Sequence, residues 1–508
     1  MKEHFDVAII GSGLGGLLCG AILSKEGKRV CIVEKNEQIG GSLQTFKHEG
    51  VTFDTGVHYI GGLAPKQNLY SIFNYVGIID RLKLHFMAED GFDVTLFHND
   101  QNEYRFGMGY ENFSRILCND FPEEEKAITQ YCIDIQEICR NFPLYNLKAA
   151  TTYSNLSIFE KSAKQYFDEL TTNKKLQNVL AGNNMLYIGI EEKTPLYVHA
   201  LVVNSYIESA AKCKNGGDQI AKLLARMIKE NGGKVLRKKR VTNIQTNEGK
   251  VEFLQLEDGS KIFADTFISN IHPAQTLELI QDSAIKSPYR NRIKSLENSI
   301  GTFVIYAKLK PKKIAYTNRN YYCFTTNDVW NTTKHNEENW PLTYALFSDE
   351  DESHHSFCKS AVIMTYMRYN ELSAWHETYN TTLQENNRSE DYLEFKKQKA
   401  EKLLKVVAKK FPEIAENIES YCTSTPLTFR DYIGTNDGSA YGIIKDFNEP
   451  LKTRILPSTK ISNLFLTGQN VNLHGILGVS ITALFTCGNI LGMEYLLNKI
   501  HQANETCH

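Results

Sequence analysis

The sequence predicts an α/β fold in which two domains are interleaved along the chain. Residues 4–36 alternate strand, glycine turn, helix and strand, which is the pattern of an α/β unit. Helical spacing returns at 159–186 and at 391–414, far from that unit. At 508 residues the chain is too long for one ordinary core, so a second domain is expected.

The N-terminal unit carries a dinucleotide-binding pattern. Gly11, Gly13 and Gly16 form G-x-G-x-x-G, whose glycines allow a tight turn, the approach of a pyrophosphate and close packing of helix on strand. The N-terminus of the helix points its N–H groups at the phosphates. Glu34 ends the second strand, where an acid can accept hydrogen bonds from a ribose. Together these features predict dinucleotide binding, against the alternative of a glycine-rich turn without a ligand.

Two further glycine-rich turns follow this unit. Gly40 and Gly41 come first, and "FDTGVHYIGG" (53–62) comes next. An NAD-binding domain would continue into another helix and strand, whereas a Gly-Gly turn suggests that the backbone doubles back beneath an extended ligand. Three such turns within the first 62 residues favour FAD, whose ribityl and isoalloxazine groups extend beyond the adenosine.

Composition and charge argue against several classes of function. A net charge of −2 gives no reason to expect nucleic acid or strong attraction to an acidic membrane. The eleven cysteines include no C-x-x-C pair and no usual zinc spacing, which suits buried thiols in a reducing compartment. No metal is expected, and His354 and His355 are interpreted as solvated loop residues. The N-terminal "MKEHFDVAIIGSG" does not resemble a cleavable signal, so a cytoplasmic location is expected.

One segment has the length of a membrane span. Residues 475–497 carry no charge before Glu494. Their glycine, serine and alanine residues also suit a helix that packs tightly within a core. We favour this second interpretation.

Five motifs stand in one order along nearly the whole chain. They are the glycine-rich stretch 40–62, the Gly-Gly, helix, Gly-Gly, strand unit 214–235, the strand meander 240–273, the Thr-Pro segment 425–442 and the C-terminal motif 464–484. Together they resemble the phytoene desaturase and carotenoid isomerase flavoproteins, and most of all their retinol saturase branch.

The resemblance implies a Rossmann-like FAD-binding domain of the glutathione-reductase and amine-oxidase type, interleaved with an α+β substrate domain. The FAD domain would take residues 1–75, 210–290 and 455–508, and the substrate domain 76–209 and 291–454. The sequence has no second G-x-G-x-x-G, so no separate NAD(P)H domain is expected. Electrons would enter at the flavin face or from a partner, and NAD(P)H is one candidate donor.

The resemblance also implies which residues hold FAD. Gly56 would bring the backbone up to the flavin, and the backbone of Val241 would contact adenine, unless Val241 is a plain buried strand valine. Gly468 is followed by Gln469 where phytoene desaturases carry an acid, and the saturase branch shares this glutamine. From the glycine turns and the resemblance together, the residues predicted to bind FAD are Gly11, Ser12, Gly13, Leu14, Gly15, Gly16, Glu34, Lys35, Gly40, Gly41, Ser42, Gly56, Val241, Gly468, Gln469 and Gly475.

Three residues are candidates for a catalytic proton donor. By resemblance, His58 and Tyr59 lie at the border of flavin and substrate, and His474 lies in the turn that enters the C-terminal helix. Saturation of a C=C bond takes a hydride from reduced flavin and a proton for the other carbon, and His and Tyr are suitable proton donors. The alternative for His58 is that it only hydrogen-bonds a backbone carbonyl to shape its turn. Tyr441 is expected in the wall of the substrate site.

The resemblance implies an FAD-dependent oxidoreductase that acts on a C=C or CH–CH bond of an apolar, isoprenoid-like substrate of the retinoid or carotenoid class. Saturation is favoured, and desaturation, isomerisation or reduction of a steroid-like enone are the alternatives. A second hypothesis is a non-catalytic lipid-binding protein such as the Rab GDP-dissociation inhibitors, which share the fold. The glycine loop, Glu34 and the C-terminal motif would have no purpose there. Because the substrate is hardly soluble, we expect peripheral membrane contact.

Overall fold

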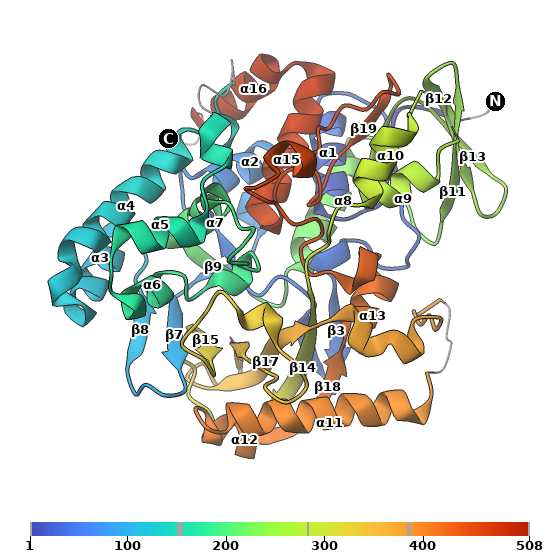
Figure 1. The fold of residues 1–508 in the computed structure, drawn as a ribbon. Helices are drawn as coiled ribbons and strands as arrows, with labels where there is room; N and C mark the ends of the chain where they lie inside the picture. The colour runs from blue at the N-terminus through green and yellow to red at the C-terminus, as the bar shows by residue number, and fades with distance from the viewer. Residues whose placement is uncertain (1–2, 150–155, 282–283, 384–387, 506–508) are drawn as a thin grey trace.

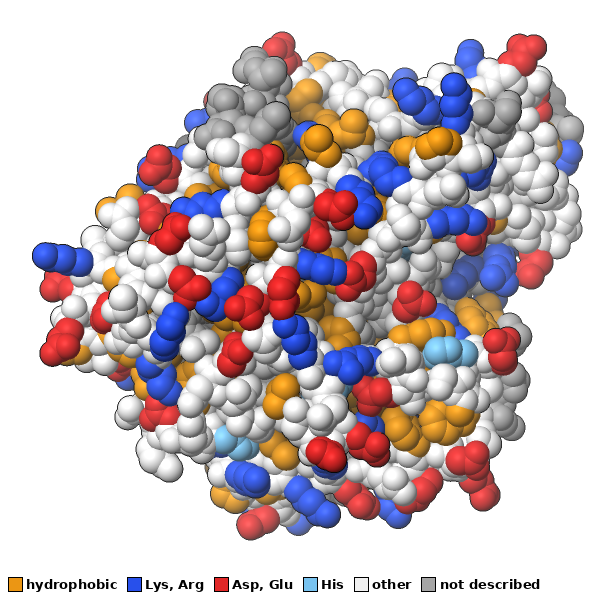
Figure 2. Space-filling model, in the orientation of Figure 1, with side chains coloured by type: hydrophobic (Ala, Val, Ile, Leu, Met, Phe, Trp, Pro, Cys, Tyr) orange, Lys and Arg blue, Asp and Glu red, His pale blue; other side chains and the backbone are white. Residues whose placement is uncertain are grey.

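The computed structural model describes residues 3–149, 156–281, 284–383 and 388–505. Two large sheets organise the fold, one in the upper half and one in the lower half of the molecule as drawn in Figure 1. Figure 2 shows acidic and basic side chains interspersed over the same face, as the net charge of −2 leads one to expect.

The first sheet contains the N-terminal unit. Its strands, in spatial order, are β10 (Lys234–Leu236), β2 (Val30–Val33), β1 (His4–Ile10), β13 (Lys261–Ser269), β12 (Lys250–Leu256) and β11 (Val241–Asn247). β19 (Leu464–Leu466) pairs in parallel with the end of β13. β1 and β2 pair in parallel, with Val7 opposite Val30. Every residue of β2 is buried, because helices and loops cover both faces of the parallel part of the sheet.

α1 (Leu14–Lys25) leaves the first sheet at the glycine loop. It packs against α8 (Asp218–Glu230) and α15 (Gly475–Leu491). A Cβ atom at Gly16 would lie 2.2 Å from the carbonyl oxygen of Gly11, so no side chain fits where the helix passes the strand. The glycine therefore allows the close helix–strand packing that the motif predicts.

The second sheet combines an early hairpin with strands from the later part of the chain. Its strands, in spatial order, are β18 (Ile418–Ser424), β14 (Gly301–Leu309), β17 (Cys358–Met367), β16 (Thr343–Glu350), β15 (Asn320–Phe324), β7 (Asp93–Phe97) and β8 (Glu103–Phe106). Neighbouring strands are antiparallel except β15 and β7, which pair in parallel.

The two faces of the second sheet have different neighbours. On β14, Phe303 and Ile305 belong to the core beneath α11 (Glu390–Val407), which runs along the lower edge of the molecule in Figure 1. Val304 and Tyr306 point the other way, into the core that contains α1, α7 (Leu196–Glu208) and α15. This second face forms a wall of the space between the two sheets.

Smaller elements complete the fold. They are β3 (Thr45–His48), β4 (Val51–Asp54), β5 (Ile60–Gly61), α2 (Asn68–Tyr75), β6 (Leu84–Phe86), α3 (Tyr110–Asp120), α4 (Glu125–Arg140), α5 (Ala163–Leu170), α6 (Lys174–Leu180), β9 (Ala210–Cys213), α9 (Pro273–Glu278), α10 (Ser287–Lys294), α12 (Pro412–Glu416), α13 (Pro426–Thr428), η9 (Phe429–Ile433), α14 (Pro450–Thr453) and α16 (Met493–Glu505).

The two stretches with helical spacing are helical but interrupted. Residues 159–186 contain α5 and α6, which are separate because the Asn173 side chain caps α6 by accepting hydrogen bonds from its first turn. Residues 391–414 contain most of α11, which ends at Val407, and the start of α12 at Pro412. The proline has no N–H to continue a helix and suits the first position of a new one.

The apolar segment 475–497 forms α15 and the beginning of α16. The two helices are divided at Gly492, which has a φ of +94°. α15 is mostly buried and packs against α1, as the favoured interpretation predicts. Within residues 3–149, 156–281, 284–383 and 388–505, no helix combines the length and apolar character that crossing a membrane requires.

The strands of the first sheet all fall within the segments 1–75, 210–290 and 455–508. Those of the second sheet fall within 76–209 and 291–454. The domain boundaries themselves stay a prediction.

A buried ion cluster ties the loop before α11 to η9. The carboxylate of Asp431 is fully buried and accepts hydrogen bonds from the Arg388 guanidinium, from Nε of Arg430 at 2.7 Å and from the backbone N–H of Asn380 at 2.9 Å. The Arg388 side chain is only 6% exposed. Removing the carboxylate would leave this guanidinium buried without its counter-ion, which is strongly unfavourable.

We therefore expect Asp431→Asn to lower the free energy of unfolding by about 3–5 kcal/mol, the usual cost of breaking a buried ion pair. Urea unfolding followed by circular dichroism measures this. Arg226→Met, which removes the exposed pair of Arg226 with Glu230, is the matched control and should leave the midpoint where it is. An Asp431→Asn protein with the wild-type midpoint would contradict the assignment.

Candidate active site

Two cavities adjoin each other: one lies between the two large sheets, and the other is lined by α7, α15 and the segment around α14. The larger has a volume of about 570 Å³ and the smaller about 360 Å³. The larger begins at the carboxyl ends of β1 and β2, the edge at which α/β sheets bind ligands. The two cavities meet at the N-terminus of α15, where both are lined by Leu186, Tyr206, Gly475 and Ile476.

The glycine loop forms one end of the larger cavity. Gly11 has a φ of +89°, a conformation that favours glycine and turns the chain sharply out of β1. A Cβ atom at Gly15 would lie 2.5 Å from Oδ1 of Asn270 and 3.0 Å from the backbone of Gly468. α1 begins at this loop, and no described side chain caps it. The helix N-terminus is thus available to an anionic group.

Glu34 is buried beside this loop, with 7% of its surface exposed. Its Oε2 accepts hydrogen bonds from the backbone N–H of Ser12 at 2.9 Å and from the Ser12 hydroxyl at 2.6 Å. Its Oε1 accepts one from the backbone N–H of Asn36 at 2.8 Å. The carboxylate therefore braces the glycine loop, and its predicted contact with a ribose stays a prediction.

The second glycine turn packs against the first, and the third packs against the second and against the start of α8. The backbone N–H of Gly40 donates to the carbonyl of Ser12 at 2.9 Å. In the third turn, Asp54 accepts a hydrogen bond from the N–H of Gly217 at 2.7 Å, which joins the turn to the start of α8. Burial raises the pKa of Asp54 to about 8. The Asp-Thr-Gly stretch is thus a structural link between two segments far apart in the chain.

The structure gathers most of the predicted residues around the larger cavity. Gly16 and His474 are the exceptions: Gly16 lies under the glycine loop, and His474 lines the smaller cavity. The predicted residues that line the larger cavity are Gly11, Ser12, Gly13, Leu14, Gly15, Glu34, Lys35, Gly40, Gly41, Ser42, Gly56, His58, Tyr59, Val241, Tyr441, Gly468, Gln469 and Gly475.

The two candidate histidines are held in different ways, and His474 lies directly before α15, as expected. The His58 ring stacks on Phe347, with centroids 4.4 Å apart, and no hydrogen bond joins it to a described residue, so it does not shape its turn by binding a carbonyl. His474 stacks on Tyr441 at 4.2 Å, and its Nε2 lies 3.0 Å from the carbonyl of Leu186. Burial lowers the pKa of each histidine to about 4.

Tyr59 is part of a buried polar network that sequence reasoning missed. Its hydroxyl lies 2.7 Å from Oδ2 of Asp93 and 2.7 Å from the hydroxyl of Tyr322. Asn320 donates to Asp93 at 3.1 Å and Asn183 at 3.4 Å. Tyr59 and Tyr322 line the larger cavity, and the fully buried Asp93 stands behind them.

Asp93 is the member of this network that titrates near neutral pH. Burial raises the pKa of its carboxyl to about 7, and the hydrogen bonds from Tyr59, Asn320 and Asn183 oppose this shift. Burial and the nearby Asp93 raise the pKa of Tyr59 well above its usual range. A proton can thus rest on Asp93 at neutral pH and reach the cavity through a phenol.

No sequence signal marks Asp93 or Tyr322. Asp93 is the first residue of β7, and Tyr322 lies within β15. Parallel pairing of these two strands, with Asn320 opposite Asp93, brings both side chains to Tyr59. Among the described residues, no group of His, Cys, Asp and Glu side chains could hold a metal ion. His354 and His355 lie beside Asp351 and Glu350 instead.

Comparison with known proteins places this chain among flavoproteins. The profile of the family described as flavin containing amine oxidoreductase matches residues 14–490. All-trans-retinol 13,14-reductases from Danio rerio and Homo sapiens are 28% and 27% identical to the chain, over 97% of it and 86% of each of them. Prolycopene isomerase from Daucus carota is 22% identical, over 97% of the chain and 81% of the isomerase.

Solved structures share the fold at low identity. An oxidoreductase from Methanosarcina mazei has a TM-score of 0.63 at 15% identity, covering 95% of this chain and 99% of that one. Wild-type putrescine oxidase has a TM-score of 0.64 at 13%, covering 96% and 99%. Rab GDI from Plasmodium falciparum has a TM-score of 0.52 at 13%, covering 97% and 99%. These similarities confirm the predicted fold class and, at such identities, show the fold alone.

The family profile extends over nearly the whole chain, from the glycine loop to the end of α15. The sequence resemblance to retinol saturases and carotenoid isomerases is confirmed by the named relatives. The chain belongs to the flavin-containing amine oxidoreductases and is a flavin-dependent oxidoreductase.

Proposed function

We propose that the protein saturates a C=C bond of an apolar, isoprenoid-like substrate of the retinoid or carotenoid class. The observation that carries this proposal is the buried Tyr59–Asp93–Tyr322 network, because it opens into the same cavity as the glycine loop. Saturation needs a proton donor beside the flavin. The name of the retinol 13,14-reductases, to which the chain is similar, supports the direction.

The larger cavity fits an extended dinucleotide. It runs from the glycine loop and Glu34 to the aromatic walls at His58 and Tyr59. At its phosphate end the backbone of Gly13 and the N-terminus of α1 would hold the pyrophosphate, and at its far end the N-terminus of α15 would favour negative charge. When bound and reduced, the flavin supplies a hydride.

We assign the proton to Tyr59 and Asp93 rather than to a histidine. With pKa values near 4, His58 and His474 are neutral at pH 7 and hold no imidazolium proton to donate. The Tyr59 hydroxyl would give its proton to the substrate carbon and take another from the Asp93 carboxyl, 2.7 Å away. Because a buried tyrosinate is unfavourable, the two transfers would be concerted. His58 and His474 would shape the walls.

The apolar lining supports this chemistry by excluding water. Tyr206 packs on Tyr59 with ring centroids 4.5 Å apart, and Phe347 and Tyr366 continue the aromatic wall. A dry cavity keeps the proton on Asp93 and accommodates an isoprenoid chain.

NAD(P)H is a candidate electron donor, although it would have no domain of its own. The compound that bleaches the flavin under anaerobic conditions would identify the donor.

We further propose that the protein is cytoplasmic and touches a membrane peripherally at the mouth of the smaller cavity. Leu451 and Leu456 line that cavity and are 75% and 50% exposed. Exposed leucines at a cavity mouth suit the interfacial collection of an apolar substrate.

Gly13→Val should abolish flavin binding while the protein still folds. The φ of Gly13 is −63°, which any residue adopts, and a Cβ atom there would meet only the flexible amide of Asn270, at 2.8 Å. The valine would fill the place where the pyrophosphate lies in this fold. Flavin absorbance of the purified protein and its circular dichroism are the two measurements. A correctly folded Gly13→Val protein with a full complement of flavin would rule out this site.

Tyr59→Phe and Asp93→Asn should slow oxidation of the reduced flavin by substrate by about 10²–10⁴-fold, the usual contribution of a positioned acid. The wild-type rate should fall as pH rises through about 7, because Asp93 loses its proton there, and Asp93→Asn should show no such fall. Stopped-flow absorbance with a panel of retinoids and carotenoids measures both.

Two variants serve as controls for this pair. Tyr131→Phe removes another buried phenol, hydrogen-bonded to His199 away from the larger cavity, and should keep the wild-type rate. His58→Phe keeps the stack on Phe347 and should react faster than Tyr59→Phe. If His58→Phe lost the wild-type rate and Tyr59→Phe kept it, the proton donor would be His58 and not Tyr59.

Replacement of the exposed leucines should weaken membrane contact. We expect wild-type protein to float with neutral liposomes and the double variant Leu451→Glu, Leu456→Glu to stay in the soluble fraction. Leu393→Glu, at a leucine 57% exposed on α11, is the matched control and should float like the wild type. Wild-type protein that never floats would contradict peripheral contact.

A further inference from the structure

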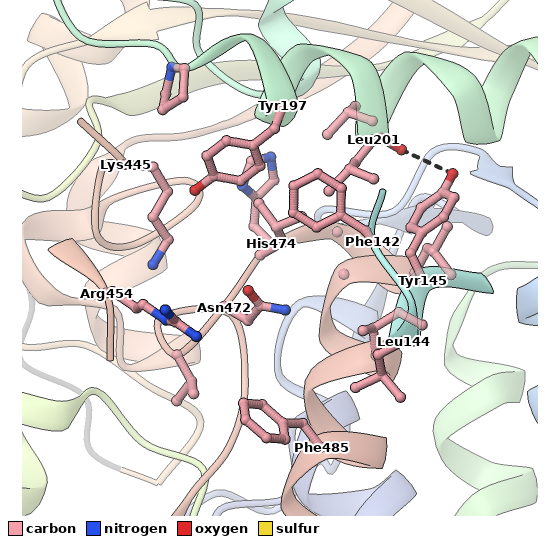
Figure 3. Close-up of a pocket in the computed structure, with 18 of the residues that line it drawn as sticks. Phe142, Leu144, Tyr145, Tyr197, Leu201, Lys445, Arg454, Asn472, His474 and Phe485 are labelled. Carbon is pink, nitrogen blue, oxygen red and sulfur yellow. Dashed lines mark hydrogen bonds between the residues drawn. The ribbon is translucent and has the colours of Figure 1, made fainter. Parts of the chain in front are cut away.

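The smaller cavity has one polar side and one apolar side. In Figure 3, Lys445 and Arg454 lie on one side of it, and Phe142, Leu144 and Leu201 lie on the other. The walls come from α7, α15 and the segment around α14. A ligand that fills this volume would therefore need an apolar body and one polar end.

Lys445 places a positive charge on the polar side, and no carboxylate of a described residue pairs with it. Nζ of Lys445 donates to the carbonyl of Thr453 at 3.2 Å, and among the described residues no carboxylate forms an ion pair with it. The Arg454 guanidinium lies 5.9 Å from the centroid of the Phe159 ring. Burial lowers the pKa of Lys445 to about 8, which leaves it protonated at neutral pH.

Two acidic residues also line this cavity, and neither neutralises Lys445. Asp446 accepts hydrogen bonds from the backbone N–H of Asn448 at 2.8 Å and from the Asn448 side-chain amide at 2.9 Å. The Asp446 carboxylate thus stabilises the turn that contains it. Glu160 is exposed at the edge of the cavity. The cavity thus contains a half-buried ammonium that no described carboxylate pairs with, and an incoming anion would offset its desolvation.

The apolar side leads to the proposed reaction centre. Tyr206 lines both cavities and packs on Tyr59, and Gly475 and Ile476 also line both. A chain whose end lies at Lys445 would pass these residues to reach the hydroxyl of Tyr59. Such a chain would fill the smaller cavity and enter only the aromatic end of the larger one, because the dinucleotide would occupy the rest.

We propose that the smaller cavity binds the carboxylate end of an apolar polyene acid, with the carboxylate against Lys445 and Arg454 and the chain directed toward Tyr59. This rests on the proposed function, because it names the acid as the class of substrate that the flavin would reduce. A carboxylate makes charge-assisted hydrogen bonds to ammonium and guanidinium groups, whereas an alcohol or an ester of the same chain leaves the lysine charge unbalanced.

Binding of a fluorescent polyene in three forms tests this proposal. The flavin-loaded wild-type protein should bind cis-parinaric acid about tenfold or more tightly than parinaryl alcohol or methyl parinarate, the effect of a charge-assisted hydrogen bond. Lys445→Met should abolish this preference, and Lys445→Arg should keep it. Lys452→Met removes a charge from the neighbouring exposed Lys452, whose side chain is 43% exposed outside the cavity, and should leave the preference unchanged.

The outcomes separate this inference from the proposed function. Equal affinity of the wild type for acid, alcohol and ester would overturn the carboxylate site, whether or not Lys445→Met folds. A preference for the acid that persists in a flavin-loaded Lys445→Met protein would also overturn it. If the flavin were oxidised by neutral polyenes and never by acids, the carboxylate site would fail and the saturase function would stand. If acids bound through Lys445 and no polyene oxidised the flavin, the reverse would hold.

Discussion

The closure of two glycine turns on Asn270 decides where the rest of the site lies. The backbone N–H of Asn270 donates to the carbonyl of Ile10 at 2.9 Å, which extends the pairing of β1 and β13 by one step. Cβ atoms built at Gly15 and Gly468 would lie 2.5 and 2.7 Å from Oδ1 of its side-chain amide. Because only glycines allow this approach, the loops after β1 and β19 meet, and α1 and α15 begin at one cavity.

Sequence reasoning reached the parts of the site that are local in the chain. Three segments can each be recognised from a few consecutive residues: the glycine loop, the Gly40–Gly41 turn and the stretch around Tyr59. The structure brings these three segments together. Asp93 and Tyr322 carry no such signal, because they reach Tyr59 only through the pairing of β7 with β15, and Asn320 is 227 residues from Asp93. The alternation of apolar residues in a strand does not specify which strand becomes its neighbour.

Burial changes the roles that side-chain chemistry alone would assign. An unperturbed histidine titrates near neutral pH, and this makes it the obvious proton donor in a sequence. Removal from water disfavours the charged form of every group, so it lowers the pKa of His58 and raises that of Asp93. The same burial thus leaves the imidazole neutral at pH 7, without an imidazolium proton to donate, and allows a carboxyl group to keep its proton there.

The distance between two polar groups, the ammonium of Lys445 and the hydroxyl of Tyr59, would determine which double bond of the substrate reacts. The cavity lining between these two groups is mainly apolar. Dispersion and desolvation along such a lining differ little from one isoprene unit to the next, so they hold a chain without fixing its register. An anion held at Lys445 fixes that register, and the double bond placed beside Tyr59 is then the one at the matching distance from the carboxylate. Specificity for one bond among many similar ones would thus come from the end of the molecule rather than from the bond itself.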